Sequence, residues 1–164
     1  MLDGVRFLKR HWPGLLTLTL ILGWIAWVPV PVVRLAMQRS KQKRTMVGMR
    51  DIASAWEARA TDLNTYGIGR ITPRNPKVMY RVKPADLKRA VAPKYIRQFP
   101  VKDGWGRDFE LWVSGDSQTY AIRSRGRDGH LDSPLIASVG PTTNLDNDIV
   151  YSNGAFIEYP EGAG

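Results

Sequence analysis

The apolar residues are distributed differently in the first fifth of the chain and in the remainder. An uncharged apolar run, WPGLLTLTLILGWIAWVPVPVV, extends from Trp12 to Val33. At about 1.5 Å per residue it reaches about 33 Å as a helix, enough to cross a hydrocarbon core of about 30 Å. Residues 12–36 are therefore predicted to form a transmembrane helix, which Pro29 and Pro31 kink near its exit rather than end.

A cleaved signal peptide is the alternative interpretation of this run. The run is longer than the apolar region of an ordinary signal peptide, about 7–15 residues, and no A-x-A-like site follows it. A retained span is therefore favoured, with residues 1–11 staying attached as a basic cytoplasmic head.

Helical periodicity continues beyond the apolar run. Helix breakers are sparse until Tyr66-Gly67, so residues 37–66 are predicted to form an amphipathic extension of the first helix. Its apolar positions recur at intervals of three and four residues and form one stripe, made of Met49, Ile52, Trp56, Ala60 and Leu63.

Residues 67–164 are predicted to form a small α+β domain. Alternating positions indicate two strands, Phe109–Val113 and Gln118–Ser124, joined by a turn. A short helix is expected at Lys83–Ala90, and Ile149–Tyr151 is expected to close the sheet. Segments without periodicity are predicted to be loops or a frayed end: residues 67–77, 130–147 and 158–164.

The segment KDGWGRDFELW, residues 102–112, places a tryptophan between two glycines. A helix packed on a small sheet needs a large side chain where the two meet, and Trp105 is predicted to be that side chain. Gly104 and Gly106 would let the chain turn sharply around it, at φ values that other residues avoid. The segment is thus interpreted as a structural corner and not as a catalytic loop.

The net charge of +9 belongs mostly to the N-terminal part. Residues 1–44 hold eight Lys/Arg and one acidic residue, whereas residues 45–164 hold sixteen Lys/Arg and fourteen Asp/Glu. Basic residues that flank an apolar run are typical of a protein at a membrane and not of a nucleic-acid-binding face. The expected partners are membrane lipids, with no nucleic acid.

The sequence carries no arrangement that predicts catalysis. There is no cysteine, and of the two histidines only His130 lies outside the flank of the apolar run. Fingerprints of hydrolases, zinc proteases, P-loop enzymes and dinucleotide enzymes do not occur. We expect no enzyme and no small-molecule substrate.

Three segments together carry a resemblance to a known family: Asp103-Gly104-Trp105-Gly106, the run YAIRSRGRDG at residues 120–129, and Asp148-Ile149. With the long N-terminal helix, they resemble the major pseudopilin of type II secretion, a relative of type IV pilins. The resemblance implies an α+β, pilin-like fold, in which a long N-terminal helix packs on a small antiparallel sheet. It also implies a bacterial inner-membrane protein with a cytoplasmic N-terminus and a periplasmic C-terminal domain.

The charge count opposes this orientation. Five basic residues follow the span and three precede it, which by the positive-inside rule favours an exported N-terminus. We give more weight to the resemblance, because a helix that continues beyond the headgroups would carry the later basic residues away from them.

The resemblance further implies a calcium site in the C-terminal turn. Calcium takes six to eight hard oxygen ligands at about 2.3–2.6 Å. Neighbouring arginines could instead pair with the same carboxylates, and Asp is also an ordinary turn former. The candidate ligands carried over from the family are Asp128, Asp148, the Arg125 carbonyl and Asp146.

The family's processing signal is missing from this sequence. Members are cut after a glycine directly before the apolar helix and carry Glu as the fifth mature residue. A cut after Gly4 would place Lys9 there, and a cut after Gly14 would place Thr19. This departure favours an unprocessed accessory subunit of a larger membrane complex over the alternative, a pseudopilin that polymerises into a fibre.

The span also offers a face for close helix packing. Gly23 and Ala26 lie nearly on one side of the helix, with Trp24 and Trp27 beside them. Because helices in lipid associate through small residues that allow close approach, this face is predicted to contact other integral membrane subunits.

Overall fold

The computed structural model describes residues 12, 14, 17, 19–21, 23, 29–69, 75–132, 134–135 and 140–161. The described residues between 12 and 23 are helical. The chain divides into two compact units, Met1–Met37 and Gln38–Gly164.

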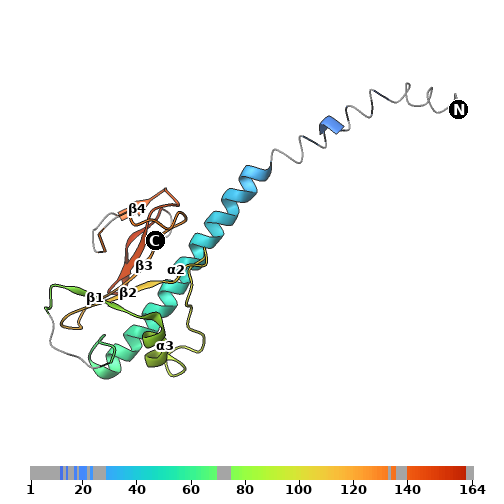
Figure 1. The fold of residues 1–164 in the computed structure, drawn as a ribbon. Helices are drawn as coiled ribbons and strands as arrows, with labels where there is room; N and C mark the ends of the chain where they lie inside the picture. The colour runs from blue at the N-terminus through green and yellow to red at the C-terminus, as the bar shows by residue number, and fades with distance from the viewer. Residues whose placement is uncertain are drawn as a thin grey trace. The chain divides into compact units, whose positions relative to one another are not determined.

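Helix α2, Pro29–Leu63, is the longest element and provides the helical face of the core (Figure 1). Proline is tolerated in the first turn of a helix, where no backbone amide needs an internal partner, so α2 can begin at Pro29. It ends before Asn64, whose φ of 54° is left-handed, a common way to terminate a helix. The predicted kink lies partly outside the described residues, which omit 24–28.

The predicted apolar stripe on this helix is confirmed for four of its five residues. Met49, Ile52 and Trp56 are completely buried and Ala60 nearly so, whereas Leu63 is 53% exposed. The buried face also extends further toward the N-terminus than predicted, to Gln42, Thr45 and Met46.

Residues of α2 that belong to the first unit expose apolar side chains. Val30, Val32, Val33, Leu35 and Met37 are 40–68% exposed. Among the described residues, no helix has both the length and the hydropathy of a membrane crossing. Much of the predicted span, including Trp24, Ala26 and Trp27, lies outside the described residues.

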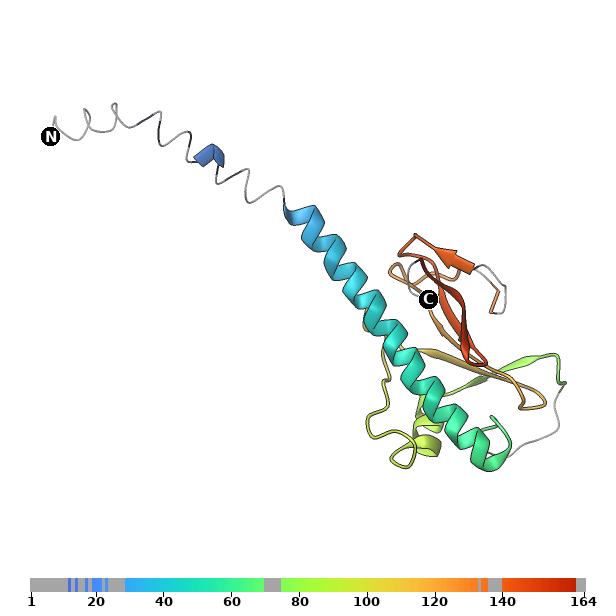
Figure 2. The same ribbon diagram turned by 180° about the vertical axis from the view of Figure 1, so that it is seen from behind.

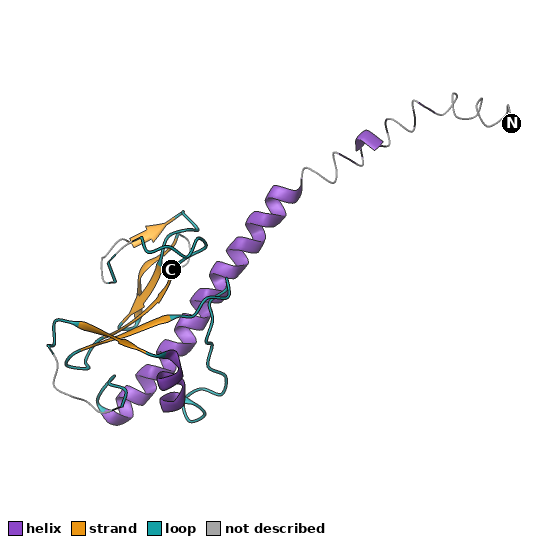
Figure 3. Ribbon diagram, in the orientation of Figure 1, coloured by secondary structure: helices purple, strands orange, loops and turns teal. Residues whose placement is uncertain are grey.

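A six-stranded sheet packs against α2 in the second unit (Figures 1 and 3). Its spatial order is β1-β2-β3-β5-β6-β4, and every neighbouring pair is antiparallel except β4 and β6. The strands are β1 Met79–Val82, β2 Glu110–Ser114, β3 Tyr120–Ser124, β4 Gly140–Thr142, β5 Ile149–Ser152 and β6 Ala155–Pro160.

Short helix α3, Pro84–Val91, completes the core, and Figure 2 shows it from behind beside the second half of α2. Its buried residues Leu87 and Val91 join the same hydrophobic cluster as Trp56 and Leu111. The molecule therefore has the α+β, pilin-like arrangement that the sequence predicts, with a mixed and mostly antiparallel sheet.

The strand predictions were correct in the middle of the domain and incomplete elsewhere. The expected strands near residues 109, 118 and 149 correspond to β2, β3 and β5 within two residues. β1, β4 and β6 were missed. The frayed tail from Glu158 was wrong for its first residues, because β6 continues to Pro160 and the Glu158 side chain is buried.

Trp56, and not Trp105, is the large side chain at the helix–sheet junction. Trp56 is completely buried, its ring lies 5.1 Å from that of Tyr120, and its indole Nε1 donates to the Tyr66 carbonyl at 2.9 Å. Trp105 is only partly buried and packs at the margin of the core. The predicted large side chain is present where helix and sheet meet, but it comes from α2 and not from the corner.

These positions predict different costs for removing the two indoles. Trp56→Ala should lower the free energy of unfolding by about 3–5 kcal/mol, the range for deleting a large buried side chain. Trp105→Ala should cost only about 1–2 kcal/mol, for one hydrogen bond and partial apolar burial. Urea unfolding of the full chain in mild detergent, followed by far-ultraviolet circular dichroism, measures both. Equal losses would contradict this assignment.

Candidate functional site: the helix-docking corner and the buried carboxylates

The glycine–tryptophan corner, residues 102–108, is organised by one carboxylate. Asp103 accepts hydrogen bonds at Oδ1 from the backbone amides of Trp105 and Arg107, both at 2.9 Å. The Asp103 amide donates to the Arg107 carbonyl at 2.7 Å, which closes the turn. Gly106 has a φ of 88°, as the sequence predicted, so that side chains other than glycine would be strained there.

Gly104 has a different role from the one predicted. Gly104 is not one of the glycines with positive φ. Instead, its lack of a side chain lets the corner approach the backbone of α2 closely. A Cβ placed at Gly104 would lie 2.0 Å from the Lys41 carbonyl oxygen. Glycine is therefore required by contact and not by conformation.

Hydrogen bonds fix the corner on the helix at this close approach. The Gly104 amide donates to Thr45 Oγ1 at 2.8 Å, and the Thr45 hydroxyl donates to the Lys41 carbonyl at 2.9 Å. One turn further toward the N-terminus, Trp105 Nε1 donates to Gln38 Oε1 at 2.9 Å. Trp105 thus acts as an anchor to the helix surface.

The same corner is also hydrogen-bonded to the end of the run YAIRSRGRDG, residues 120–129, which carries part of the resemblance. Ser124 Oγ donates to Asp103 Oδ2 at 2.8 Å. Arg107 donates from Nη1 to the Gly126 carbonyl at 2.7 Å and from Nη2 to the Arg127 carbonyl at 2.8 Å. Two of the three segments that carry the resemblance therefore form one connected unit on the helix.

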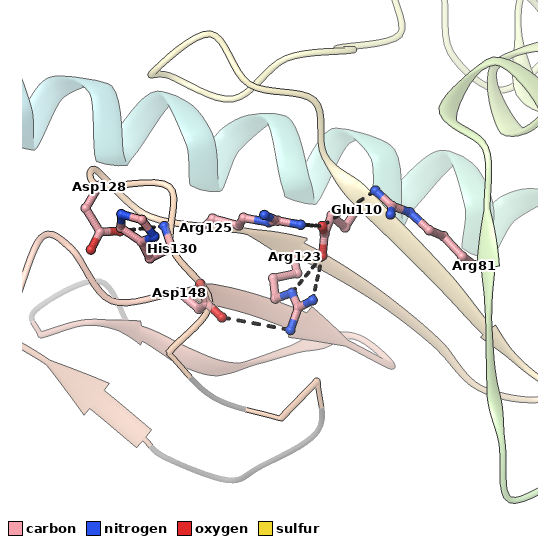
Figure 4. A network of polar contacts seen from close by, with 7 residues as sticks. All are labelled: Arg81, Glu110, Arg123, Arg125, Asp128, His130 and Asp148. Carbon is pink, nitrogen blue, oxygen red and sulfur yellow. Dashed lines mark hydrogen bonds and ion pairs between the residues drawn. The ribbon is translucent and has the colours of Figure 1, made fainter.

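A second cluster lies on the face of the sheet that points away from the α2 core (Figure 4). In the strand register Glu110 is opposite Arg123, Arg123 is opposite Val150, and Val150 is opposite Glu158, so their side chains share one face. Glu110, Arg123 and Glu158 are all buried. This row of charged residues was not predicted from the sequence. A signal for it was present, because in the two predicted strands Glu110 alternates with Leu111 and Arg123 alternates with Ile122, which places both charged residues on the face opposite the core.

Three arginines converge on the Glu110 carboxylate. Arg123 contacts Oε2 through Nε at 3.0 Å and Nη2 at 2.6 Å; Arg125 contacts Oε1 through Nε at 3.0 Å and also through Nη2. Arg81 reaches Oε1 from the rim at 3.5 Å. Burial alone would raise the pKa of Glu110, but the hydrogen bonds from Arg123 and Arg125 outweigh it and lower this pKa.

Asp148 is buried without comparable compensation. Its nearest ion-pair partner is Arg123 Nη1, 3.9 Å from Oδ2, and neither of its carboxylate oxygens has a hydrogen-bond partner of normal geometry among the described residues. Burial raises the pKa of Asp148 to about 6, while the charge of Arg123 and the backbone of Asp132 act in the opposite direction. The negative charges of Asp132 and Glu158 also raise this pKa.

Each of the four candidate calcium ligands interacts with a different group of the protein. Asp146 forms a two-pronged ion pair with Arg127, with both distances 2.6 Å, which lowers the pKa of Asp146. Asp128 Oδ1 accepts from the His130 amide at 2.9 Å, and the Arg125 carbonyl accepts from the Gly129 amide at 3.1 Å. No three acidic, His or Cys side chains within the described segments form a group that could hold a metal ion. Calcium binding stays a prediction.

Of the predicted helix-contact residues, only Gly23 is described. It is helical and exposed, and a Cβ added there would meet no atom within 4 Å. Ala26, Trp24 and Trp27 lie outside the described residues.

Comparison of the chain with protein family models, with curated proteins and with solved structures gave no match.

The corner geometry predicts that Gly104 tolerates no side chain. Gly104→Ala should lower the free energy of unfolding by at least about 2 kcal/mol, because the corner must move off the helix to make room. Gly106→Ala is the matched control: it has positive φ but no atom within 4 Å of an added Cβ, so it should cost only about 1 kcal/mol of strain. Thermal unfolding followed by circular dichroism compares the two. A larger loss for Gly106→Ala would contradict the close-approach explanation.

The raised pKa of Asp148 predicts a specific dependence of stability on pH. Between about pH 4 and 6 the unfolded chain loses this proton while folded Asp148 keeps it, so the contribution to stability declines as pH rises. The decline amounts to about 3 kcal/mol, since one pKa unit corresponds to about 1.4 kcal/mol. Asp148→Asn removes this term, so the difference in unfolding free energy, variant minus wild type, should increase from pH 4 to pH 7.

Asp146→Asn is the control for this measurement. Its pKa is lowered by Arg127, so wild type gains stability relative to this variant as pH rises toward about 4, and the difference between the two should stay nearly constant from pH 4 to pH 7. A difference for Asp148→Asn that does not change with pH would contradict the buried-carboxyl interpretation. In the same assay, stabilisation of wild type but not of Asp148→Asn by millimolar calcium would support the calcium prediction.

Proposed function

We propose that this protein is a non-catalytic, single-span protein of the bacterial inner membrane, with a cytoplasmic N-terminus and a pilin-like periplasmic domain. In this proposal it serves as a structural or accessory subunit of a larger membrane complex of secretory, respiratory or photosynthetic type. The observation that carries the proposal is the change along α2: apolar side chains are exposed from Val30 to Met37, whereas one face of the helix is buried from Met46 to Ala60.

This change argues for two different environments along one helix. These closely spaced exposed valine, leucine and methionine side chains are unfavourable in water. Val30, Val32 and Val33 end the uncharged run that starts at Trp12, and Leu35 and Met37 follow it directly after Arg34. The later half of the helix is covered by the protein's own sheet and α3. Lipid or neighbouring helices are the environment that suits the first half.

An accessory role is favoured over a fibre because of the residues at the start of the chain. A fibre-forming pseudopilin of the resembled family needs a glycine cleavage site and Glu at the fifth mature position, where Lys9 or Thr19 would stand here. The pseudopilin function remains the second candidate, because the pilin-like fold and the connection of the Asp103 corner to the Gly126 turn fit it.

The packing face of the span provides the test. Gly23→Leu with Ala26→Leu should release the protein from its complex, because two large side chains prevent close approach of a partner helix. Thr17→Leu with Val28→Leu adds bulk on the other side of the helix, by the period of 3.6 residues, and should leave the complex intact. The measurement is the amount of each variant that copurifies with the native complex from solubilised membranes.

Two outcomes would decide against the accessory role. One is recovery of the Gly23/Ala26 variant in the complex at wild-type stoichiometry. The other is recovery of wild type only as filaments of a single polypeptide, with an intact mass that shows cleavage after Gly4 or Gly14; this result would support the pseudopilin function.

A further inference from the structure

In the described part of the chain, a group of basic side chains without ion-pair partners lies on α2. Arg39, Lys43 and Arg44 are exposed, and between Asp3 and Asp51 the sequence contains no acidic residue. The positions between and after them, Gln42 and Thr45, are buried against the domain. We call Arg39, Lys43 and Arg44 the basic collar.

The domain does not neutralise the basic collar. The ion pairs among the described residues involve arginines and lysines from position 81 onward, and none uses Arg39, Lys43 or Arg44. By contrast the guanidinium carbon of Arg50, six residues after Arg44, lies 5.1 Å from the centre of the Phe156 ring. Three adjacent charges are thus left for a ligand from outside the domain.

The position of the collar in the sequence indicates which ligand it suits. Arg39 lies six positions after Val33, the last residue of the uncharged run, which is about 9 Å along an α-helix. The headgroup layer on each side of a bilayer is about 5–8 Å thick, and long basic side chains reach back toward it. If the apolar run occupies the hydrocarbon core, the collar lies at the level of the lipid phosphates.

We propose that the basic collar binds the phosphate headgroups of anionic phospholipids; this inference rests on the membrane anchorage proposed above. Guanidinium groups form paired, charge-assisted hydrogen bonds with phosphate, and a clustered ammonium adds to the attraction. A second copy of this domain is a poor alternative ligand, because residues 45–164 carry a net positive charge.

The proposal is tested with the full chain reconstituted in phosphatidylcholine vesicles that contain a trace of spin-labelled lipid. Electron paramagnetic resonance gives the relative affinity for phosphatidylglycerol over phosphatidylcholine at the protein surface. Wild type should prefer phosphatidylglycerol about fivefold, which corresponds to about 1 kcal/mol for a basic side chain at an anionic surface. The preference should disappear near 1 M salt, where the Debye length is about 3 Å.

Replacement of the collar by glutamine should strongly reduce this preference. The test variant is Arg39→Gln/Lys43→Gln/Arg44→Gln, which leaves out Lys41 because that residue is only partly exposed. The control variant Lys77→Gln/Lys88→Gln/Arg97→Gln removes the same charge from exposed positions of the domain and should keep the preference. Both variants should unfold at the wild-type temperature, since all six side chains are exposed.

The outcomes of these experiments separate the collar proposal from the membrane anchorage. Wild type that resists extraction by alkaline carbonate but shows equal affinity for both lipids would overturn the collar proposal alone and leave an acidic partner protein as the ligand. An equal loss of preference in both triple variants would overturn it too, because the effect would then depend on total charge. Extraction of wild type by carbonate would overturn the membrane anchorage and the collar together.

Discussion

The close contact between the corner and the backbone of α2 is the constraint on which the rest of the domain depends. At Gly104 the polypeptide comes near enough to the Lys41 carbonyl that no side chain fits between them. This approach brings the Gly104 amide to Thr45 and the Trp105 indole to Gln38. From the same corner, Asp103 and Arg107 hold the turn after β3. Helix, corner and sheet are thus positioned by one short set of bonds.

The other face of the sheet shows a different balance of forces. Buried charges are costly unless they are paired and hydrogen-bonded, and Glu110 meets this condition through three arginines. Asp148 does not, and it responds by holding its proton to a higher pH. Two carboxylates on the same face of one sheet therefore have pKa values shifted in opposite directions, and the difference arises from the number of arginines within reach.

Much of this architecture could be predicted from sequence because periodicity reports burial. The spacing of Met49, Ile52 and Trp56 identified the buried helix face, and the alternation around Leu111 and Ile122 identified the central strands. The sequence also contained an unused signal for β6: Asn153-Gly154, both at positive φ, is the residue pair that favours a two-residue hairpin. β1 and β4 offered no such signal, since short strands at the edges of a sheet depend on tertiary pairing.

The candidate site was less predictable than the fold. Gly104 was identified as a corner glycine, but its reason is a contact between residues 63 positions apart in the chain, which no local pattern encodes. Similarly, the pairing of Glu110 with Arg123 needs the strand register, and the isolation of Asp148 needs knowledge of what surrounds it. Residue types and spacing indicate candidates, whereas their chemistry depends on neighbours brought together by folding.

The strand order has a consequence for biosynthesis. β6 is the last strand along the chain, yet it lies inside the sheet between β5 and β4. Until β6 emerges, β4 has no neighbour to pair with, and the outer edge of β5 stays open. A chain synthesised from its N-terminus therefore has an unfinished sheet edge until its final segment is available, and such edges associate readily with other chains. A chaperone that covers exposed strand edges would be most useful to this protein in that interval.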